Sequence, residues 1–345
     1  MSQTYKVRVL DPLRDLPGVA ALLESEVPVY AGTKKSAAEY EAHLHWLVRE
    51  NPDRDRWPGG WVLESSAGEI AGVHLSVPRI FSGPEGRVPF FFSCYYFVKA
   101  EARGMESLGL YLSYRKLAAE GVLMASSANA HSAPLWQKMG GQTVPGTETE
   151  YLKPLSLRPL AEEALHRRLG FRLPFSRARN DWTLPPPSPV PGLHWLRSAE
   201  EIAGAALEPS SGDLSPVRSA AWLRWKFLRT GAGAARLYRW DGGAAPVFVA
   251  VALSVRGWRG QIRCLQITDA WTARGPCSAP ALQAVVASHR RHVDAVTVRG
   301  LGSLVSAAQS LRWRPRGLAA PMFWWSPAHA AGMTALAELY PDSGA

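Results

Sequence analysis

The segment from Arg103 to Gly109 carries residue types that suit phosphate binding, and it reads Arg-Gly-Met-Glu-Ser-Leu-Gly. The start of a helix presents unbonded N–H groups and a partial positive charge, and glycine lets backbone approach a phosphate closely. Arg103, Gly104, Ser107, Leu108 and Gly109 are the residues here that suit such contact with an anion. Two glycines in a loop are more often a plain turn, so this interpretation depends on the place of the segment between an aromatic strand and a helix.

The other reactive side chains argue against metal or disulfide chemistry. Cys94, Cys264 and Cys277 are odd in number and widely spaced, unlike a disulfide framework or a zinc site. We therefore expect no metal and a reducing compartment. Cys94 lies in apolar strand sequence, which favours an inert buried thiol over a nucleophile. Glu64 lies beside a predicted turn, which favours a solvated face over a general base.

The elements of the first half must position these residues. An alternating strand at 6–10 precedes an amphipathic helix that begins near Asp11, and residues 60–78 predict strand, turn and strand. The aromatic run 89–98 is expected to be a central strand. A helix at 110–120, a short strand at 121–126 and a loop and helix at 129–141 complete this half.

The second half repeats this order of elements. Residues 193–207 predict a strand and a helix, with Ser198 and Glu201 as a capping box. Residues 236–253 predict strand, turn and strand, and 261–311 predict strand, helix, strand and helix. Because 345 residues exceed what one core usually organises, two domains are expected. We place them at residues 1–155 and 192–345, with a basic, proline-rich connector at 156–191.

The element order of residues 5–155 resembles the GNAT (acyl-CoA N-acyltransferase) superfamily. The resemblance is carried by Arg103-Gly104…Gly109 after an apolar strand and by Asn129…Pro134-Leu-Trp-Gln-Lys-Met-Gly140. The second half resembles the superfamily in element order only. The resemblance implies an α/β (α+β) fold of two tandem GNAT-like domains, each a mixed central sheet flanked by helices. It places the acyl-donor site in the first domain and acceptor or partner binding in the second.

The resemblance also implies a set of donor-binding residues. In the superfamily, the donor's pantetheine pairs with the edge of a splayed strand, here Phe97, Val98 and Lys99. Its pyrophosphate lies on the backbone of the next helix start, and Asn129 and Trp136 join the cofactor-binding set. The loop departs from the superfamily pattern Arg/Gln-x-x-Gly-x-Gly by one extra residue and by Glu106, which lies where an anion approaches.

The chemistry implied is attack by an amine on a thioester. The superfamily often uses a tyrosine to protonate the leaving thiolate, and the corresponding residue here is Trp136, whose indole is no acid at neutral pH. The candidate catalytic residues are therefore Tyr96, His131 and Ser132. The implied co-substrate is acetyl-CoA or another acyl-CoA, and the implied acceptor is the primary amine of a small molecule, an amino sugar or a peptide.

Charge and hydropathy leave several partners open. Residues 1–150 carry 15 Lys/Arg against 17 Asp/Glu, and residues 151–345 carry 24 against 12. This excess favours an anionic partner, which is coenzyme A, an acyl carrier protein or tRNA, although a merely arginine-rich surface gives the same count. The run 221–229 interleaves aromatic and basic residues; we interpret it as an amphipathic helix rather than a nucleic-acid grip.

The leading hypothesis is thus a GNAT-type N-acyltransferase. The alternatives are a Fem-like transferase that uses aminoacyl-tRNA, a transferase that uses an acyl carrier protein, and an inactive binding module. The N-terminus has no apolar signal-like run, and no segment approaches the ~18 apolar residues of a membrane helix. We expect a cytoplasmic protein without a membrane partner.

Overall fold

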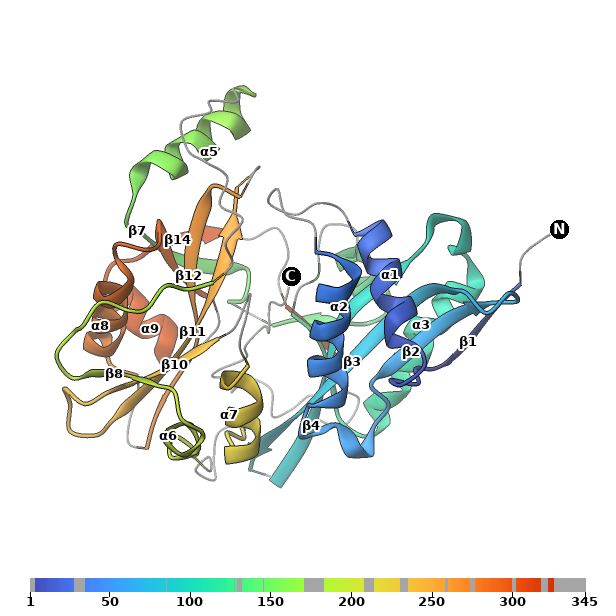
Figure 1. The fold of residues 1–345 in the computed structure, drawn as a ribbon, viewed down its shortest axis with the longest axis horizontal. Helices are drawn as coiled ribbons and strands as arrows, with labels where there is room; N and C mark the ends of the chain where they lie inside the picture. The colour runs from blue at the N-terminus through green and yellow to red at the C-terminus, as the bar shows by residue number, and fades with distance from the viewer. Residues whose placement is uncertain are drawn as a thin grey trace.

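Two mixed sheets flanked by helices lie side by side, with the helix α7 (Ala220–Phe227) packed between them (Figure 1). This is the architecture that the sequence predicts. The structure is a computed structural model that describes residues 4–27, 35–84, 86–126, 128, 132–144, 146–170, 183–207, 214–229, 235–257, 260–273, 277–299, 302–317 and 322–325.

The first sheet has the strand order β1-β2-β3-β4-β5-β15-β6, and the short strand β9 pairs with β3. β1 to β4 are antiparallel, whereas β4 and β5 are parallel. The strands are β1 (Tyr5–Val9), β2 (Gly60–Ser65), β3 (Ile70–Gly83), β4 (Gly86–Val98), β5 (Val122–Ala125), β6 (Gln142–Thr143), β9 (Ser215–Pro216) and β15 (Phe323–Trp325).

The second sheet has the strand order β14-β7-β13-β12-β11-β10-β8. It repeats the plan of the first, because β12 and β13 are its parallel pair and β11 and β12 are antiparallel. The strands are β7 (Thr149–Pro154), β8 (Leu193–Leu196), β10 (Arg236–Trp240), β11 (Val247–Arg256), β12 (Ile262–Thr272), β13 (Ala295–Arg299) and β14 (Arg314–Gly317).

Each half of the chain lends one strand to the sheet of the other half. β7 lies between β13 and β14 of the second sheet, and β15 lies between β5 and β6 of the first. The two sheets therefore do not divide at residue 155 as the predicted domains do. β7 lies in the sequence of the predicted first domain but belongs to the second sheet. Each lent strand completes hydrogen-bond ladders that would otherwise end at an open edge.

Helices cover both faces of the first sheet. α1 (Leu16–Glu26) and α2 (Ala37–Leu44) cover one face, and α3 (Met105–Arg115) covers the other (Figure 1). The predicted capping box at Ser198 and Glu201 is confirmed at the start of α6. The other helices are α4 (Ala133–Lys138), α5 (Leu157–Leu169), α6 (Ala199–Ala203), α8 (Ala279–His289) and α9 (Ser303–Ser310). None of the helices in the described ranges combines the length and apolar composition that crossing a bilayer requires.

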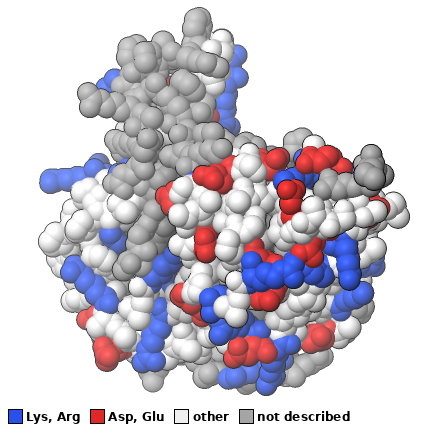
Figure 2. Space-filling view, turned by 45° about the vertical axis from the view of Figure 1, so that its right-hand side comes forward, with Lys and Arg blue, Asp and Glu red and all other residues white. Residues whose placement is uncertain are grey.

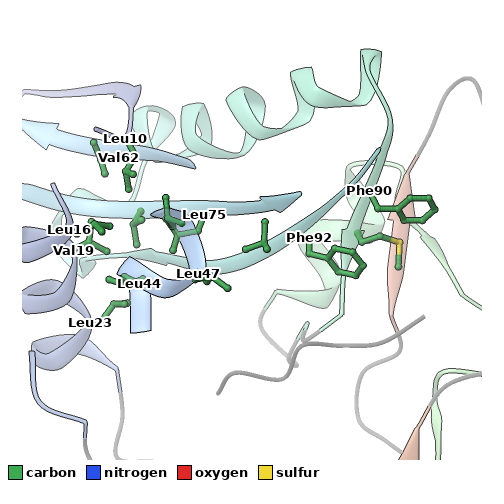
Figure 3. Close-up of a cluster of buried hydrophobic side chains, with 14 of the residues drawn as sticks. Leu10, Leu16, Val19, Leu23, Leu44, Leu47, Val62, Leu75, Phe90 and Phe92 are labelled. Atoms are coloured by element: carbon green, nitrogen blue, oxygen red, sulfur yellow. The ribbon is translucent and has the colours of Figure 1, made fainter. Parts of the chain in front are cut away.

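Separate apolar clusters fill the two faces of the first sheet. The cluster under α1 and α2 includes Leu23, Leu44 and Leu75, all fully buried, and it extends along β4 to Phe90 (Figure 3). The cluster under α3 includes Leu63, Leu110 and Phe323, so the lent strand β15 contributes to this core. A further cluster lies beneath α8 and α9 in the second half.

The start of α3 differs from the sequence prediction. The helix was expected at 110–120, but it begins at Met105 and ends at Arg115. Ser107, Leu108 and Gly109 are therefore helical residues and not loop residues. Close packing explains the glycine at position 109, because a Cβ there would lie 3.0 Å from Cγ2 of Val7 on β1. The expected loop shortens to the turn between β4 and Gly104.

Candidate functional site

β4 and β5 separate part-way along their length. Their parallel pairing covers only Phe90 to Phe92 on β4, opposite Val122 to Met124 on β5. β4 continues to Val98, and residues 93–98 pair with β3 on one side only. The two strands thus diverge beyond Phe92 and Met124, and we call the region between their diverging ends the opening.

A β-bulge in β4 lies at this opening. The pairing register with β3 shifts so that His74 faces both Tyr95 and Tyr96. Tyr95 has a φ of 47°, a backbone conformation that is rare for a bulky residue and typical of functional sites. The bulge turns Tyr95 toward α2 and Tyr96 toward α3: Tyr95 contacts the rings of Tyr40 and His43, while Tyr96 lies 4.9 Å from the ring of His74.

Tyr114 of α3 fills the point where the strands separate. Its hydroxyl donates to the carbonyl of Phe91 on β4, lies 3.2 Å from the carbonyl of Met124 on β5, and accepts from the N–H of Met124 at 3.3 Å. The side chain is fully buried. Because the hydroxyl takes part in the hydrogen bonding between β4 and β5 at this point, it acts as a spacer between them. Sequence reasoning missed this residue.

His74 packs against the same tyrosine. Its ring centroid lies 4.4 Å from that of Tyr114, and its Nε2 lies 2.8 Å from Oγ of Ser93. Burial lowers the pKa of His74 to about 3, so the ring is neutral at physiological pH. His74 therefore supports the bulge as a packed, uncharged side chain.

Fewer residues of β4 direct backbone groups to the opening than the sequence predicted. The N–H of Lys99 donates to the carbonyl of Ala71 on β3 at 2.9 Å. Antiparallel pairing alternates, so Phe97 and Lys99 direct their backbone groups to β3 and Val98 directs its groups to the opening. The carbonyl of Val98 accepts a hydrogen bond from Nε of Arg103 at 3.2 Å. Of the three predicted edge residues, Val98 is the one that faces the opening.

The start of α3 has the geometry of an anion site. Gly104 is the N-cap, and Leu108 is the first residue whose N–H returns to it, at 3.3 Å. The N–H groups of Met105, Glu106 and Ser107 precede that bond and have no partner within the helix. The Ser107 hydroxyl bonds both the N–H and the carbonyl of Gly104 and fixes the turn. Glu106 is exposed, and its carboxylate lies near Gly104.

The other predicted site residues are only partly brought together. Ser132 is half-buried at the N-cap of α4. Trp136 is buried and packs edge-on against Tyr111 and Tyr114, which are contacts of a core residue. Asn129 and His131 lie outside the described residues. The roles assigned to all four remain predictions.

The surroundings of Glu64 and Cys94 agree with the prediction from the sequence that neither side chain is catalytic. Glu64 pairs with Arg8 at 2.8 Å and also with Arg14, and the hydrogen bond from Arg8 is the main cause that holds its pKa below the usual range. Burial raises the pKa of the Cys94 thiol to about 12, so the sulfur stays protonated. Neither group has the environment of a neutral-pH base or nucleophile.

The face of the opening opposite α3 meets the second half of the chain. Trp46 and Trp225 stack with ring centroids 4.6 Å apart, and each indole N–H donates to the other residue's carbonyl at 3.0 Å. Arg229 lies 4.5 Å from the ring of Trp46, and its Nη1 lies 3.0 Å from Nδ1 of His43. The aromatic and basic run at 221–229 is thus the helix α7 and its end, with its aromatic side chains packed inside the protein.

The corresponding end of the second sheet is bound by the chain itself. β12 pairs with β13 from Cys264 to Ile267 and then continues to Thr272 with β11 as its only partner among the described strands. On this stretch, buried Asp269 forms an ion pair with Arg218 at 2.8 Å, and the indole of Trp271 donates to Ala205 at 3.0 Å. β12 also has a bulge, opposite Ala250 and Val251 of β11, so the two halves differ in what packs against the diverging strand and not in the bulge itself.

Comparison with known proteins places this geometry in a known fold. No protein-family model and no curated protein sequence matches the chain. Solved structures do match it. N-myristoyltransferase of Saccharomyces cerevisiae with bound myristoyl-CoA is 10% identical, with a TM-score of 0.52 over 93% of this chain and 82% of that one. The chain has the tandem GNAT fold.

Two bacterial structures agree with this assignment. A probable N-acyltransferase from Enterococcus faecalis is 13% identical, with a TM-score of 0.53 over 94% of this chain and 72% of that one. A GCN5-related N-acetyltransferase from Anabaena variabilis is 15% identical, with a TM-score of 0.50 over 93% and 72%. Because more than nine-tenths of the chain is covered, the GNAT likeness includes the diverged second half.

Proposed function

We propose that this protein is an acyl-CoA-dependent N-acyltransferase whose donor site lies between β4 and β5. The observation that carries the proposal is the opening itself: a bulged strand separates from its parallel neighbour, and after a short turn a helix begins whose first N–H groups have no partner within the helix. Pantetheine contains two amides and can pair with backbone as a peptide does, and Val98 is the residue that offers such an edge.

The start of α3 would hold the phosphates of the donor. Backbone N–H groups and the helix dipole favour negative charge there, and Arg103 adds a cation beside it. The acyl end then enters the opening from the α3 face. In support, the S. cerevisiae neighbour holds myristoyl-CoA. The acyl group is proposed to be acetyl, and longer chains are tested beside it.

The reaction transfers the acyl group to a primary amine. The nitrogen bonds to the thioester carbonyl carbon, the C–S bond breaks, and one proton passes from nitrogen to sulfur, which leaves an amide and the thiol of coenzyme A. Tyr96 is the proposed proton donor, because the bulge places it on the α3 face and burial raises its pKa, which keeps its proton in place. Ser132 and His131 stay the alternatives.

Calorimetry and thermal shift with coenzyme A, acetyl-CoA and acyl-CoAs up to myristoyl-CoA test the donor. Micromolar binding corresponds to about −8 kcal/mol. Gly104→Asp and Arg103→Ala should each weaken it at least tenfold, whereas Arg168→Ala, an exposed control on α5, should not. Tyr96→Phe should lower kcat with unchanged donor affinity. Failure of every coenzyme A species to bind would refute the proposal and redirect the search to carrier-protein and aminoacyl-tRNA donors.

A further inference from the structure

A basic cavity lies in the second half, next to the end of α7. Its volume is about 340 Å³, and Arg197, Arg229 and Arg236 line it together with Trp195. The guanidinium groups of Arg197 and Arg236 lie 4.1 and 4.2 Å from the ring of Trp195. Among the described residues that line the cavity, none is Asp or Glu. By contrast, acidic and basic side chains are interspersed on the molecular face drawn in Figure 2.

Arg229 connects this cavity with the opening in the first sheet. Its Nη1 lies 3.0 Å from Nδ1 of His43, and the His43 ring lies 6.0 Å from that of Tyr95 on the bulge. Burial lowers the pKa of His43 to about 3, so the ring is neutral and its Nδ1 accepts the hydrogen bond from Arg229. Burial lowers the pKa of Arg229, but a guanidinium stays protonated in proteins, so a cation lies at the boundary between the cavity and the opening.

A second cation approaches the same place from the first half. Nζ of Lys35 lies 5.8 Å from the ring centroid of Tyr40, which in turn contacts Tyr95. Burial and the charge of Arg229 both lower the pKa of Lys35. Two cations repel each other, and water screens this repulsion less where both are half-buried. An anion bound between them would therefore be stabilised.

The carboxylates near these cations also bond other groups. Glu39 attracts Lys35 but caps α2 through the backbone N–H of Ser36 at 2.8 Å, and Glu50 attracts Arg229 but lies 2.9 Å from Nδ1 of His45. On the far side of the cavity, Glu201 accepts from the backbone N–H of Arg197 and Ser198. A ligand anion would thus supply charge that the described side chains around Arg229 and Lys35 do not supply in full.

We propose that the acceptor amine carries a carboxylate or phosphate that binds between Arg229 and Lys35, with its amine directed to the β4 bulge. This inference rests on the proposed acyl transfer and names the substrate class of the same site. Charged hydrogen bonds to an arginine fork give both affinity and orientation, so the anion would fix the amine relative to the thioester. The remainder of the acceptor would extend along the cavity toward Arg197 and Arg236.

Matched pairs of amines test the proposal, with release of the coenzyme A thiol as the readout. Glycine is compared with glycinamide, and O-phosphoethanolamine with ethanolamine, so that each pair differs by its one anionic group. In at least one pair the anionic member should have a kcat/KM at least tenfold higher. The first pair tests a carboxylate and the second tests a phosphate. Equal use of both members in all pairs would overturn the inference.

Two variants distinguish a role in anion recognition from a structural role. Arg229→Gln and Lys35→Gln should each raise KM for the anionic member about tenfold and leave the neutral member unchanged. Arg224→Gln, an exposed change on the helix α7 that precedes Arg229, is the control. If Arg229→Gln weakens both members equally, the role of Arg229 is structural and the inference fails.

A measurement of donor binding distinguishes failure of the proposed function from failure of the present inference. If acyl-CoA does not bind the wild-type protein, the proposed function fails. If acyl-CoA binds but anionic and neutral amines behave alike, only the present inference fails. Should no amine be acylated, calorimetry of the same pairs with the coenzyme A complex decides: tighter binding of the anionic members supports the inference, and equal or absent binding counts against it.

Discussion

Replacing Tyr114 with phenylalanine removes a single oxygen from the point where β4 and β5 separate. That oxygen donates to one carbonyl and accepts from the N–H of Met124, and every group involved is buried. Losing a hydrogen bond and leaving a buried backbone group unpaired costs about 1–3 kcal/mol. We expect Tyr114→Phe to lower the free energy of unfolding by about 2 kcal/mol, because one donated and one accepted bond are lost.

Urea denaturation followed by tryptophan fluorescence measures this loss, and calorimetry with acyl-CoA measures its effect on the opening. The strands can pair further once the hydroxyl is gone, so donor affinity should also fall. Tyr111→Phe is the matched control, since Tyr111 is buried one turn earlier and its hydroxyl forms no hydrogen bond within the described part of the chain. If Tyr114→Phe is as stable as wild type and binds the donor equally well, the hydroxyl is not a spacer and the reasoning is wrong.

Three further predictions concern charge, pH and the exchanged strand. Glu106→Gln should tighten acyl-CoA binding about fourfold at low salt, because a charge about 5 Å from a phosphate in water contributes about 0.8 kcal/mol, and 0.5 M salt should reduce this gain. His43 and His74 have pKa values lowered by burial to about 3. Their contribution to stability is complete above pH 6.5 and is lost as the pH falls toward 3, by up to about 1.4 kcal/mol per unit for each histidine; His74→Phe should flatten the slope in urea titrations. Phe323→Ala should cost about 3–5 kcal/mol in the same assay, since this fully buried ring of β15 belongs to the core under α3; a loss below 1 kcal/mol would contradict the strand exchange.

The element order was predictable from the sequence because it depends on local signals. Alternation and aromatic density marked β4, and the pair Ser198 and Glu201 marked the start of α6. The start of α3 was misplaced because Gly109 resembles a loop residue. Its glycine is required by close packing against Val7, which lies about a hundred residues earlier in the chain and is invisible to local reasoning.

The least predictable features depend on contacts between distant segments. β15 is a three-residue strand whose partners, β5 and β6, lie some 180–200 residues earlier, and nothing in its own residues specifies them. Likewise, a tyrosine in an amphipathic helix is normally core, and only the separation of β4 from β5 gives the Tyr114 hydroxyl its function. The interpretation of 221–229 as a helix with packed tryptophans was confirmed, but its contact with Trp46 came from the structure.

The roles that we propose for the two halves depend on what packs against the diverging strand of each sheet. In the first half the bulge and the start of α3 lie on one chain segment, so the proposed donor site needs residues of that half alone. In the second half Arg218 and Asp269 form an ion pair on the part of β12 that extends beyond β13, and Arg229, which follows α7, contacts the first half. The second half can therefore form a wall of the site proposed in the first. The reciprocal Trp46 and Trp225 hydrogen bonds and the two exchanged strands hold that wall in place, so an acceptor would meet cations already positioned and lose little free energy in ordering them.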